Sequence, residues 1–337
     1  MEILLTGNAM KVSIFSTKSY DQQFFTAANA QHQHELIFLE PRLDHQTALL
    51  AKDTRAVCVF INDEVDKDTI EALANQNVSL IALRSAGYNH VDVQAAKNLG
   101  IKLVRVPAYS PNAVAEHTVG LILTLNRKLH RAYNRVREGN FSLEGLLGFD
   151  LYGRTIGIIG TGRIGTVVAQ IMTGFGCKVI AYDRYHNPQC EAISVQYVDM
   201  PQLLSQSDII TLHCPLTSET QHLINQEAIA QMKPNIMLIN TSRGALIDTE
   251  AVITALKLSQ ISALGLDVYE QESELFFEDR SNRILQDDTF ARLMTFPNVM
   301  ITGHQAFFTE DAMNAIAEVT LANITQIEQG QICENEI

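Results

Sequence analysis

The sequence predicts an α/β protein built from two doubly wound, parallel-sheet domains of the Rossmann-like or flavodoxin-like kind. Short β-branched runs alternate with longer helical patterns along most of the chain, which is typical of parallel sheets covered by helices. These runs fall into two series, and one long helical pattern separates them. The chain has 337 residues, which is enough for two domains of ordinary size.

The predicted strands are short runs with strong β-propensity. The first series comprises residues 12–15, 35–39, 56–60, 79–83 and 102–106. The second series comprises residues 155–159, 178–182, 208–212, 236–239, 262–266 and 299–302.

The helix between the two series is expected to span residues 111–138. Ser110 is a suitable N-cap, Pro111 occupies the first helical position and Gly139 follows a basic last turn. The middle of this helix, Val119–Leu125, is apolar nearly all round, which predicts burial between domains or in a subunit interface. A final helical pattern at 310–328 comes after the second series and could pack on the first domain.

Composition excludes several classes of protein. Apolar residues make up 46% and charged residues 19% of the chain, as in globular proteins, and a net charge of -13 argues against a nucleic-acid partner. No apolar run approaches the length of a membrane span, and the first residues do not resemble a signal peptide. The five cysteines are scattered without a C-x-x-C pair, which favours a reducing, cytoplasmic location without disulfides. No function is assigned to residues 1–9.

A glycine-rich motif is the clearest chemical signal. Gly160, Gly162 and Gly165 form G-x-G-x-x-G directly after a predicted strand and at the start of a predicted helix. In that context the glycines permit a tight turn, close approach to a pyrophosphate and close helix–strand packing. Asp183 ends the next strand, where a carboxylate binds the adenosine ribose, and this favours NAD over NADP. The adjacent Arg184 could soften that preference.

Charged and titratable residues follow the later strands of the second series. Arg243 follows one strand, Asp267, Glu270 and Glu272 follow the next, and His304 follows the last. Ligands of open α/β sheets bind at these carboxyl ends, so the side chains are expected beside the dinucleotide. An arginine can grip the carboxylate of a 2-oxo acid, a histidine can protonate its carbonyl oxygen, and a carboxylate can orient the imidazole.

Each of these residues also has a structural interpretation. Arg243 alone could be a surface charge, a single histidine is more often structural, and Glu272 could be a solvated loop residue. His213 also follows a strand and is the main rival acid, although Cys214-Pro215 directly after it suggests packing on the cofactor. The pair His32 and His34 lacks a third ligand, so both are interpreted as surface residues and no metal site is predicted.

Seven motifs identify the chain as similar to a known family. They are "LRSAGYNHVD", "RVPAYSPNAVAEHT", "GIIGTGRIG", "LHCPLT", "INTSRGALID", "GLDVYEQE" and "TGHQAFFTE". With them the chain resembles the D-isomer-specific 2-hydroxyacid dehydrogenases nearly end to end from Met10. The segments "VPAYSP" and "LFFEDRSN" resemble the fermentative D-lactate dehydrogenase branch most closely.

The resemblance implies roles for particular residues. Arg243 is expected to bind substrate, His304 to donate the proton and Glu272 to be its partner, because the family pattern D-V-[FY]-x-x-E selects Glu272 over Glu270. The two phenylalanines of "LFFEDRSN" are interpreted as core residues. The substrate would also meet the backbone N–H groups of Ala86 and Gly87 and the side chain of Tyr109. The cofactor contacts implied are Gly160, Gly162, Arg163, Ile164, Gly165, Asp183, Cys214, Pro215, Thr220 (where many relatives have Asn), Thr241 and Asp267.

The family fold implies a discontinuous substrate domain of residues 1–109 plus 306–337 and an NAD domain of residues 110–305, with the active-site cleft between them. A homodimer or homotetramer is expected. The activity implied is NADH-dependent, reversible reduction of pyruvate to D-lactate. Two alternatives are another 2-oxo acid as substrate, and a non-catalytic NAD-sensing protein.

Overall fold

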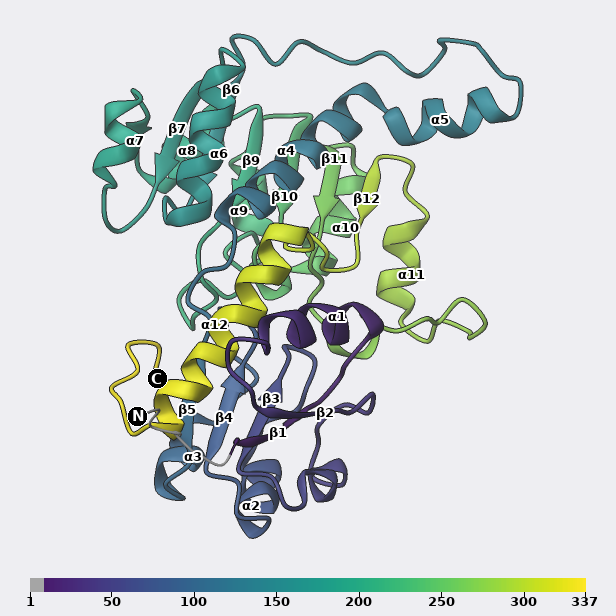
Figure 1. Cartoon of the computed structure of the whole chain (residues 1–337). Helices are drawn as coiled ribbons and strands as arrows, with labels where there is room; N and C mark the ends of the chain where they lie inside the picture. The colour runs from purple at the N-terminus through teal and green to yellow at the C-terminus, as the bar shows by residue number, and fades with distance from the viewer. Residues whose placement is uncertain (1–8) are drawn as a thin grey trace. The chain divides into compact units, whose positions relative to one another are not determined.

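The computed structural model describes residues 9–337, and the chain divides into two compact units. The first unit contains the residues up to Ser110 together with Phe308–Ile337, and the second unit is Pro111–Phe307. Each unit has one sheet in which all paired strands are parallel, with helices packed against it (Figure 1). The predicted fold class, α/β with two parallel sheets, is confirmed. No helix among the described residues is long and apolar enough to cross a membrane.

The sheet of the first unit has five strands in the order β2-β1-β3-β4-β5. The strands are β1 (Lys11–Ile14), β2 (Glu35–Phe38), β3 (Ala56–Val59), β4 (Leu80–Leu83) and β5 (Lys102–Arg105). The helices are α1 (Ser19–Ala28), α2 (Lys67–Asn75), α3 (Val93–Asn98), α12 (Glu310–Glu328) and the short 3-10 helix η1 (Thr47–Ala51).

Burial on both faces of this sheet explains why its strands are apolar without interruption. In β3, Val57 and Val59 belong to the core on one face, whereas Ala56 and Cys58 belong to the core on the other. Helix α12 packs against α1, β4 and β5, and its apolar side chains complete the second of these cores. This packing attaches the C-terminal segment to the first unit.

The sheet of the second unit has seven strands in the order β12-β11-β10-β9-β6-β7-β8. The strands are β6 (Thr155–Ile159), β7 (Lys178–Tyr182), β8 (Gln196–Tyr197), β9 (Ile209–Leu212), β10 (Ile236–Asn240), β11 (Ile261–Leu266) and β12 (Val299–Ile301). The chain winds outward from β6 through β7 to β8, and then returns to β9 on the other side of β6. The strand order therefore reverses between β6 and β9, and ligands of open α/β sheets bind at such a reversal.

Helices cover both faces of this second sheet. They are α4 (Pro111–Arg127), α5 (Leu129–Arg137), α6 (Arg163–Gly174), α7 (Pro188–Ala192), α8 (Met200–Gln206), α9 (Gln226–Ala230), α10 (Thr249–Lys257) and α11 (Asp288–Met294). The short 3-10 helices η2 (Gly244–Leu246) and η3 (Glu272–Glu274) follow β10 and β11.

The prediction of a single helix over residues 111–138 is wrong, because the structure has two helices there. Lys128 has a left-handed backbone, with φ of 50°, and this residue separates α4 from α5. The apolar middle of α4 packs against α6 and the sheet of its own unit, and in β11 the absence of a side chain at Gly265 leaves room for Leu121 and Leu125. Burial within the second unit therefore explains this apolar segment, which was expected between domains or subunits.

The interpretation of His32 and His34 as surface residues is also wrong. His34 is buried, its Nε2 lies 2.9 Å from Thr325 Oγ1, and burial lowers its pKa. His32 is half-buried and contacts Thr325 Oγ1 at 2.9 Å and Glu318 at 3.3 Å. The two histidines therefore join the segment before β2 to α12. Within residues 9–337 no three His, Cys, Asp or Glu residues are grouped to hold a metal ion.

Candidate active site

The glycine-rich loop after β6 has no room for side chains at two of its three glycines. Gly160 has φ of 97°, and a Cβ there would lie 2.6 Å from the backbone nitrogen of Cys214, after β9. A Cβ at Gly165 would lie 2.0 Å from the carbonyl oxygen of Gly160, so the first turn of α6 packs directly on the loop. Gly160 and Gly165 therefore permit the loop, the helix and the end of β9 to meet closely.

Gly162 differs, because a Cβ there would meet no protein atom within 4 Å. It is the N-cap of α6, and as a glycine it places no capping side chain over the start of that helix. The N-terminus of a helix binds phosphates through its backbone N–H groups, and the helix dipole adds to the attraction. The loop therefore fits the pyrophosphate of a dinucleotide, with Arg163 exposed at the helix start and Ile164 half-buried against the core.

Asp183 follows β7, and its carboxylate is fixed by the same loop. Its Oδ2 accepts hydrogen bonds from the backbone nitrogen of Thr161 at 2.6 Å and from the Thr161 hydroxyl at 3.1 Å. The neighbouring Arg184 is exposed and forms an ion pair with Glu219. Arg184, which follows Asp183 in the chain and could attract a 2′-phosphate, thus has a carboxylate partner in this structure.

The other expected cofactor residues lie after β9 and β10. The Thr241 hydroxyl is buried and lies 2.8 Å from that of Thr118. Thr220 donates to the carbonyl oxygen of Pro215 at 2.7 Å and so stabilises its own loop, in which Pro215 is exposed. Cys214 is half-buried, and burial raises the pKa of its thiol to about 11, which leaves it an uncharged packing surface.

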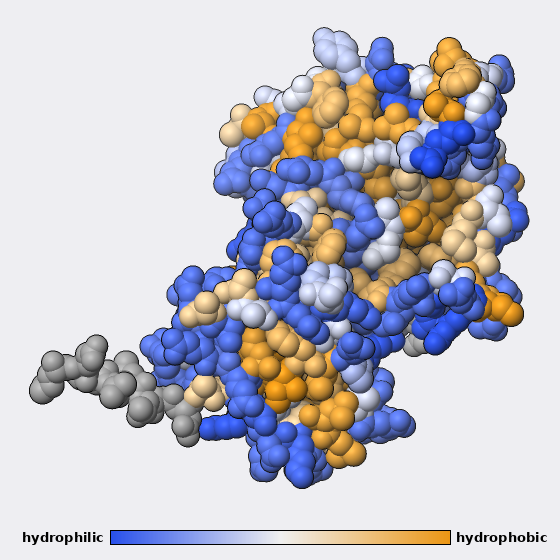
Figure 2. Space-filling model, turned by 45° about the vertical axis from the view of Figure 1, so that its right-hand side comes forward, coloured by the Kyte–Doolittle hydropathy of each residue, from blue (hydrophilic) through white to orange (hydrophobic). Residues whose placement is uncertain are grey.

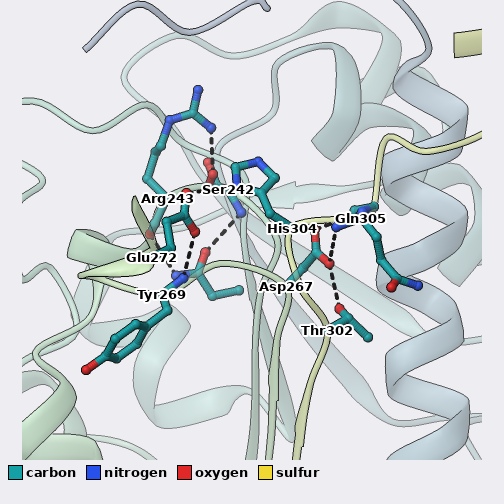
Figure 3. A network of polar contacts seen from close by, with 10 residues as sticks. Ser242, Arg243, Asp267, Tyr269, Glu272, Thr302, His304 and Gln305 are labelled. Carbon is teal, nitrogen blue, oxygen red and sulfur yellow. Dashed lines mark hydrogen bonds and ion pairs between the residues drawn. The ribbon is translucent and has the colours of Figure 1, made fainter. Parts of the chain in front are cut away.

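His304 and Glu272 form a hydrogen-bonded pair at the ends of β12 and β11. His304 Nδ1 lies 2.8 Å from Glu272 Oε1, and Glu272 Oε2 accepts the backbone N–H of Tyr269 at 2.9 Å (Figure 3). Both carboxylate oxygens are therefore held, and the imidazole presents Nε2 as the nitrogen that can exchange a proton with a ligand. His304 has φ of 51°, a left-handed conformation that is uncommon for residues with a side chain.

Asp267 fixes the backbone that carries His304. Its side chain is fully buried and accepts the backbone N–H groups of Gln305 and Ala306, both at 2.9 Å, and the Thr302 hydroxyl at 2.5 Å (Figure 3). Its carbonyl oxygen accepts the N–H of His304 at 2.7 Å. These contacts explain how the strained His304 conformation is maintained, because the residues around it are held by a single buried carboxylate.

Sequence reasoning missed His117 and Thr302, which complete this network. His117 Nε2, on α4, lies 3.0 Å from Thr302 Oγ1 and 3.4 Å from Asp267 Oδ1. Both residues stand in motifs that were already quoted, "AEHT" and "TGHQ". Their position beside motif residues was the available signal.

Arg243 lies on the loop after β10, beside the loop that carries Glu272. Its Nη1 donates to the carbonyl oxygen of Ser242 at 2.7 Å, and its own carbonyl oxygen accepts from the Asn240 side chain at 2.8 Å (Figure 3). The backbone is thus anchored to β10, while the half-buried guanidinium has donors beyond the one used. The structure brings Arg243, Glu272 and His304 together at the same end of the sheet.

Two further predictions about this region have different outcomes. Phe276 is buried and packs edge-on against Phe290, as expected of a core residue. Phe277 is half-buried with φ of 68°, and its ring centroid lies 5.7 Å from that of His304, a contact that was not predicted.

The rival acid His213 lies in a different environment. Its Nε2 contacts the Thr211 hydroxyl at 2.9 Å, and burial lowers its pKa to about 3. A histidine with such a pKa is neutral at the pH of most cells and is a poor proton donor. This favours His304 as the acid.

The expected substrate residues Ala86, Gly87 and Tyr109 belong to the first unit. Ala86 and Gly87 are half-buried after β4, where the Ser85 hydroxyl donates to the Gly87 carbonyl oxygen at 2.8 Å. Arg105, at the end of β5, donates to the Ala86 carbonyl oxygen at 2.9 Å. Tyr109 is half-buried shortly after β5. All three therefore follow the carboxyl ends of adjacent strands.

A parallel sheet with a strand-order reversal, a phosphate-binding glycine loop and a histidine–carboxylate pair define an NAD-dependent oxidoreductase. Residues 119–306 match the family model of the D-isomer specific 2-hydroxyacid dehydrogenase, NAD binding domain. The chain belongs to the D-isomer-specific 2-hydroxyacid dehydrogenases, as the resemblance indicated, and NAD as the predicted cofactor is confirmed.

Relatives match nearly the whole chain. A 2-hydroxyacid dehydrogenase homolog of Haemophilus influenzae is 54% identical over 97% of this chain and 98% of its own length. D-lactate dehydrogenase of Escherichia coli is 51% identical over 97% of this chain and 100% of its own. Among solved structures, that of the pyruvate reductase of Chlamydomonas reinhardtii superposes with a TM-score of 0.92 at 45% identity, covering 97% of this chain and 98% of that one.

Proposed function

We propose that this protein catalyses the reversible, NADH-dependent reduction of pyruvate to D-lactate. The hydrogen-bonded pair of His304 and Glu272, next to Arg243 at the cofactor-binding end of the sheet, carries this proposal. The names of two relatives, D-lactate dehydrogenase and pyruvate reductase, support pyruvate as the oxidised substrate.

The proposed roles follow from the chemistry of each side chain. NADH, when bound, supplies a hydride to C2 of the 2-oxo acid. Arg243 binds the substrate carboxylate with paired hydrogen bonds, and His304 donates a proton from Nε2 to the carbonyl oxygen. Glu272 orients the ring through Nδ1 and stabilises the imidazolium. In the direction of lactate oxidation, neutral His304 accepts the hydroxyl proton.

In this proposal the two units make different contacts with the ligands. The second unit binds the dinucleotide through Gly160, Gly162 and Gly165, with Asp183 at the ribose. The first unit contributes Ala86, Gly87 and Tyr109 to the substrate. Substitutions in either unit would then weaken substrate binding.

A substrate panel tests the proposal. Initial rates with NADH are measured for pyruvate, 2-oxobutyrate, phenylpyruvate and glyoxylate, and the configuration of the product is read with stereospecific lactate assays. We expect the highest kcat/KM with pyruvate and a product of D configuration. A higher kcat/KM for another 2-oxo acid would assign the enzyme to that acid, and absence of turnover with all of them would favour a binding protein.

We also propose that the protein forms a homo-oligomer through the segment that follows α4. Helix α5 and the loop that leads to β6 extend away from the sheet of the second unit (Figure 1). Phe141, Leu143 and Leu147 on this loop are 76%, 82% and 88% exposed, and α5 exposes Leu129, Tyr133 and Val136. Hydrophobic residues are visible among the polar ones at the molecular surface (Figure 2). Apolar side chains this exposed on one segment are typical of a subunit contact.

A further inference from the structure

Glu270, two residues before Glu272, also forms a pair with a histidine. His222 Nε2 lies 2.5 Å from Glu270 Oε1, and the Thr249 hydroxyl donates to Glu270 Oε2 at 2.9 Å. The family pattern selected Glu272 over Glu270 as the partner of His304, and both carboxylate oxygens of Glu270 are occupied by other residues. The side chain of Glu274 lies outside the part that the structure describes. Two histidine–glutamate pairs therefore share one loop.

The backbone around His222 is hydrogen-bonded to the segment after Arg243. The His222 N–H donates to the carbonyl oxygen of Ala245 at 2.8 Å, and the Ile224 N–H donates to that of Leu246 at 3.0 Å. His222 has φ of 49°, so this turn keeps a residue with a side chain in the left-handed region. A strained residue that holds two segments at once is more typical of a positioning role than of a surface loop.

The two segments that His222 joins also touch each other directly. A Cβ on Gly244 would lie 2.1 Å from the carbonyl carbon of Tyr269 and 2.3 Å from the nitrogen of Glu270. Only a glycine next to Arg243 therefore lets its loop rest on the Tyr269–Glu270 peptide. The N–H of Tyr269, on the preceding peptide, donates to Glu272, so a shift of Tyr269 would move the partner of His304.

We propose that the pair of His222 and Glu270 is a positioning device that fixes the Arg243 loop against the Glu272 loop. Through its backbone His222 holds the segment after Arg243, and through its side chain it holds Glu270, two residues before Glu272. The pair thus sets the placement of the substrate-binding arginine relative to the proton-donating dyad. This inference rests on the proposed roles of those three residues.

Three variants test this device. His222→Asn removes the donor from the position of Nε2, Glu270→Ala removes the acceptor, and His222→Gln restores a donor because its amide nitrogen reaches about as far as Nε2. We expect His222→Asn and Glu270→Ala to lower kcat/KM for pyruvate by about 10- to 100-fold, as small displacements of reacting groups do. The change should divide between a lower kcat and a higher KM, while the dissociation constant of NADH changes by less than about twofold. His222→Gln should recover most of the lost activity.

The matched control is His32→Asn in the first unit. His32 also pairs with a glutamate through Nε2 and with a threonine hydroxyl, but it lies on the segment before β2. We expect this variant to lose thermal stability without a change in kcat/KM. The double variant His222→Asn/Glu270→Ala should be no slower than the slower single variant, because both changes break the same contact.

The results that overturn the inference are specific. One is a kcat and KM of wild-type size in His222→Asn, even where its melting temperature falls as in His32→Asn. Another is equal activity of His222→Gln and His222→Asn, which would assign His222 a backbone role alone.

Oxamate, an unreactive isostere of pyruvate, separates this inference from the proposed function. Its binding to the NADH complex, followed by nucleotide fluorescence, should weaken by about tenfold in His222→Asn and recover in His222→Gln. If the wild-type enzyme binds neither pyruvate nor oxamate, the substrate proposal fails first, and the panel acid with the highest rate replaces pyruvate in the same comparison. If His222→Asn binds oxamate with unchanged affinity and has an unchanged kcat, the positioning role of His222 is contradicted and the proposed function is not.

Discussion

His304 and Glu272 are joined by a 2.8 Å contact between Nδ1 and Oε1, although 32 residues separate them in the chain. One follows β12 and the other follows β11, and these strands are neighbours in the sheet. Parallel pairing brings the carboxyl ends of the two strands to the same edge, and Asp267 then fixes the peptides after His304. The dyad is therefore a product of the sheet topology and of one buried carboxylate.

Replacement of His304 by glutamine should remove the proton donor and leave the fold unchanged. General acid catalysis contributes about 10²- to 10⁴-fold to rates, so we expect kcat for pyruvate reduction to fall by at least about 100-fold. Affinity for NADH should stay near the wild-type value, because the glycine loop is untouched. Steady-state kinetics and NADH fluorescence titration measure the two quantities. A near wild-type kcat would show that another group is the acid.

Asp267→Asn should affect both stability and catalysis. An amide has one oxygen where the carboxylate has two, so at least one of its buried N–H or hydroxyl donors loses its acceptor, at a cost of about 1–3 kcal/mol. The peptide next to His304 is then free to move, and kcat should fall with the free energy of unfolding. Thr302→Val, which removes a single donor, is the control with the smaller expected loss. Denaturation curves and kcat are compared, and lower stability with unchanged kcat would contradict the positioning role of Asp267.

Local sequence patterns predicted what local physics determines. The glycine loop was recognisable because Gly160 and Gly165 are required by contacts within one strand–turn–helix segment. The pair of His222 and Glu270 was not recognisable in the sequence, because 48 residues separate them and their contact depends on the left-handed turn at His222. The break at Lys128 was missed for a similar reason, since no glycine or proline marks it.

Asp183→Ala should change the preference between NADH and NADPH. The carboxylate accepts from Thr161 and stands where the adenosine ribose is expected, so its loss removes both an acceptor and a repulsive charge. We expect the ratio of kcat/KM for NADH to that for NADPH to fall by about tenfold or more. Asp199→Ala, an N-cap change at α8, serves as the control for general loss of stability. An unchanged ratio would remove Asp183 from cofactor selection.

His213 should make the folded protein sensitive to acid. Burial lowers its pKa from 6.5 to about 3, so between these values the unfolded chain binds a proton that the folded chain does not. Its contribution to stability is thus fully present above pH 6.5 and decreases as the pH falls, by up to about 1.4 kcal/mol per pH unit. His213→Gln, which does not titrate, should show a shallower decrease between pH 6 and pH 4 in urea denaturation. Parallel slopes for the two proteins would show that His213 does not contribute.

Two charged substitutions on the loop before β6 should separate the subunits of the proposed oligomer. Leu143 and Leu147 are almost fully exposed, so Leu143→Glu/Leu147→Glu has little effect on the folded chain itself but places carboxylates in an apolar contact, which costs several kcal/mol. We expect sedimentation to change from a dimer or larger species to the 37.5 kDa monomer. Leu258→Glu, at an exposed leucine after α10, should leave the assembly intact. A wild-type protein that already sediments as a monomer would exclude the contact. If the control Leu258→Glu also dissociates the oligomer, the subunit contact lies elsewhere on the second unit.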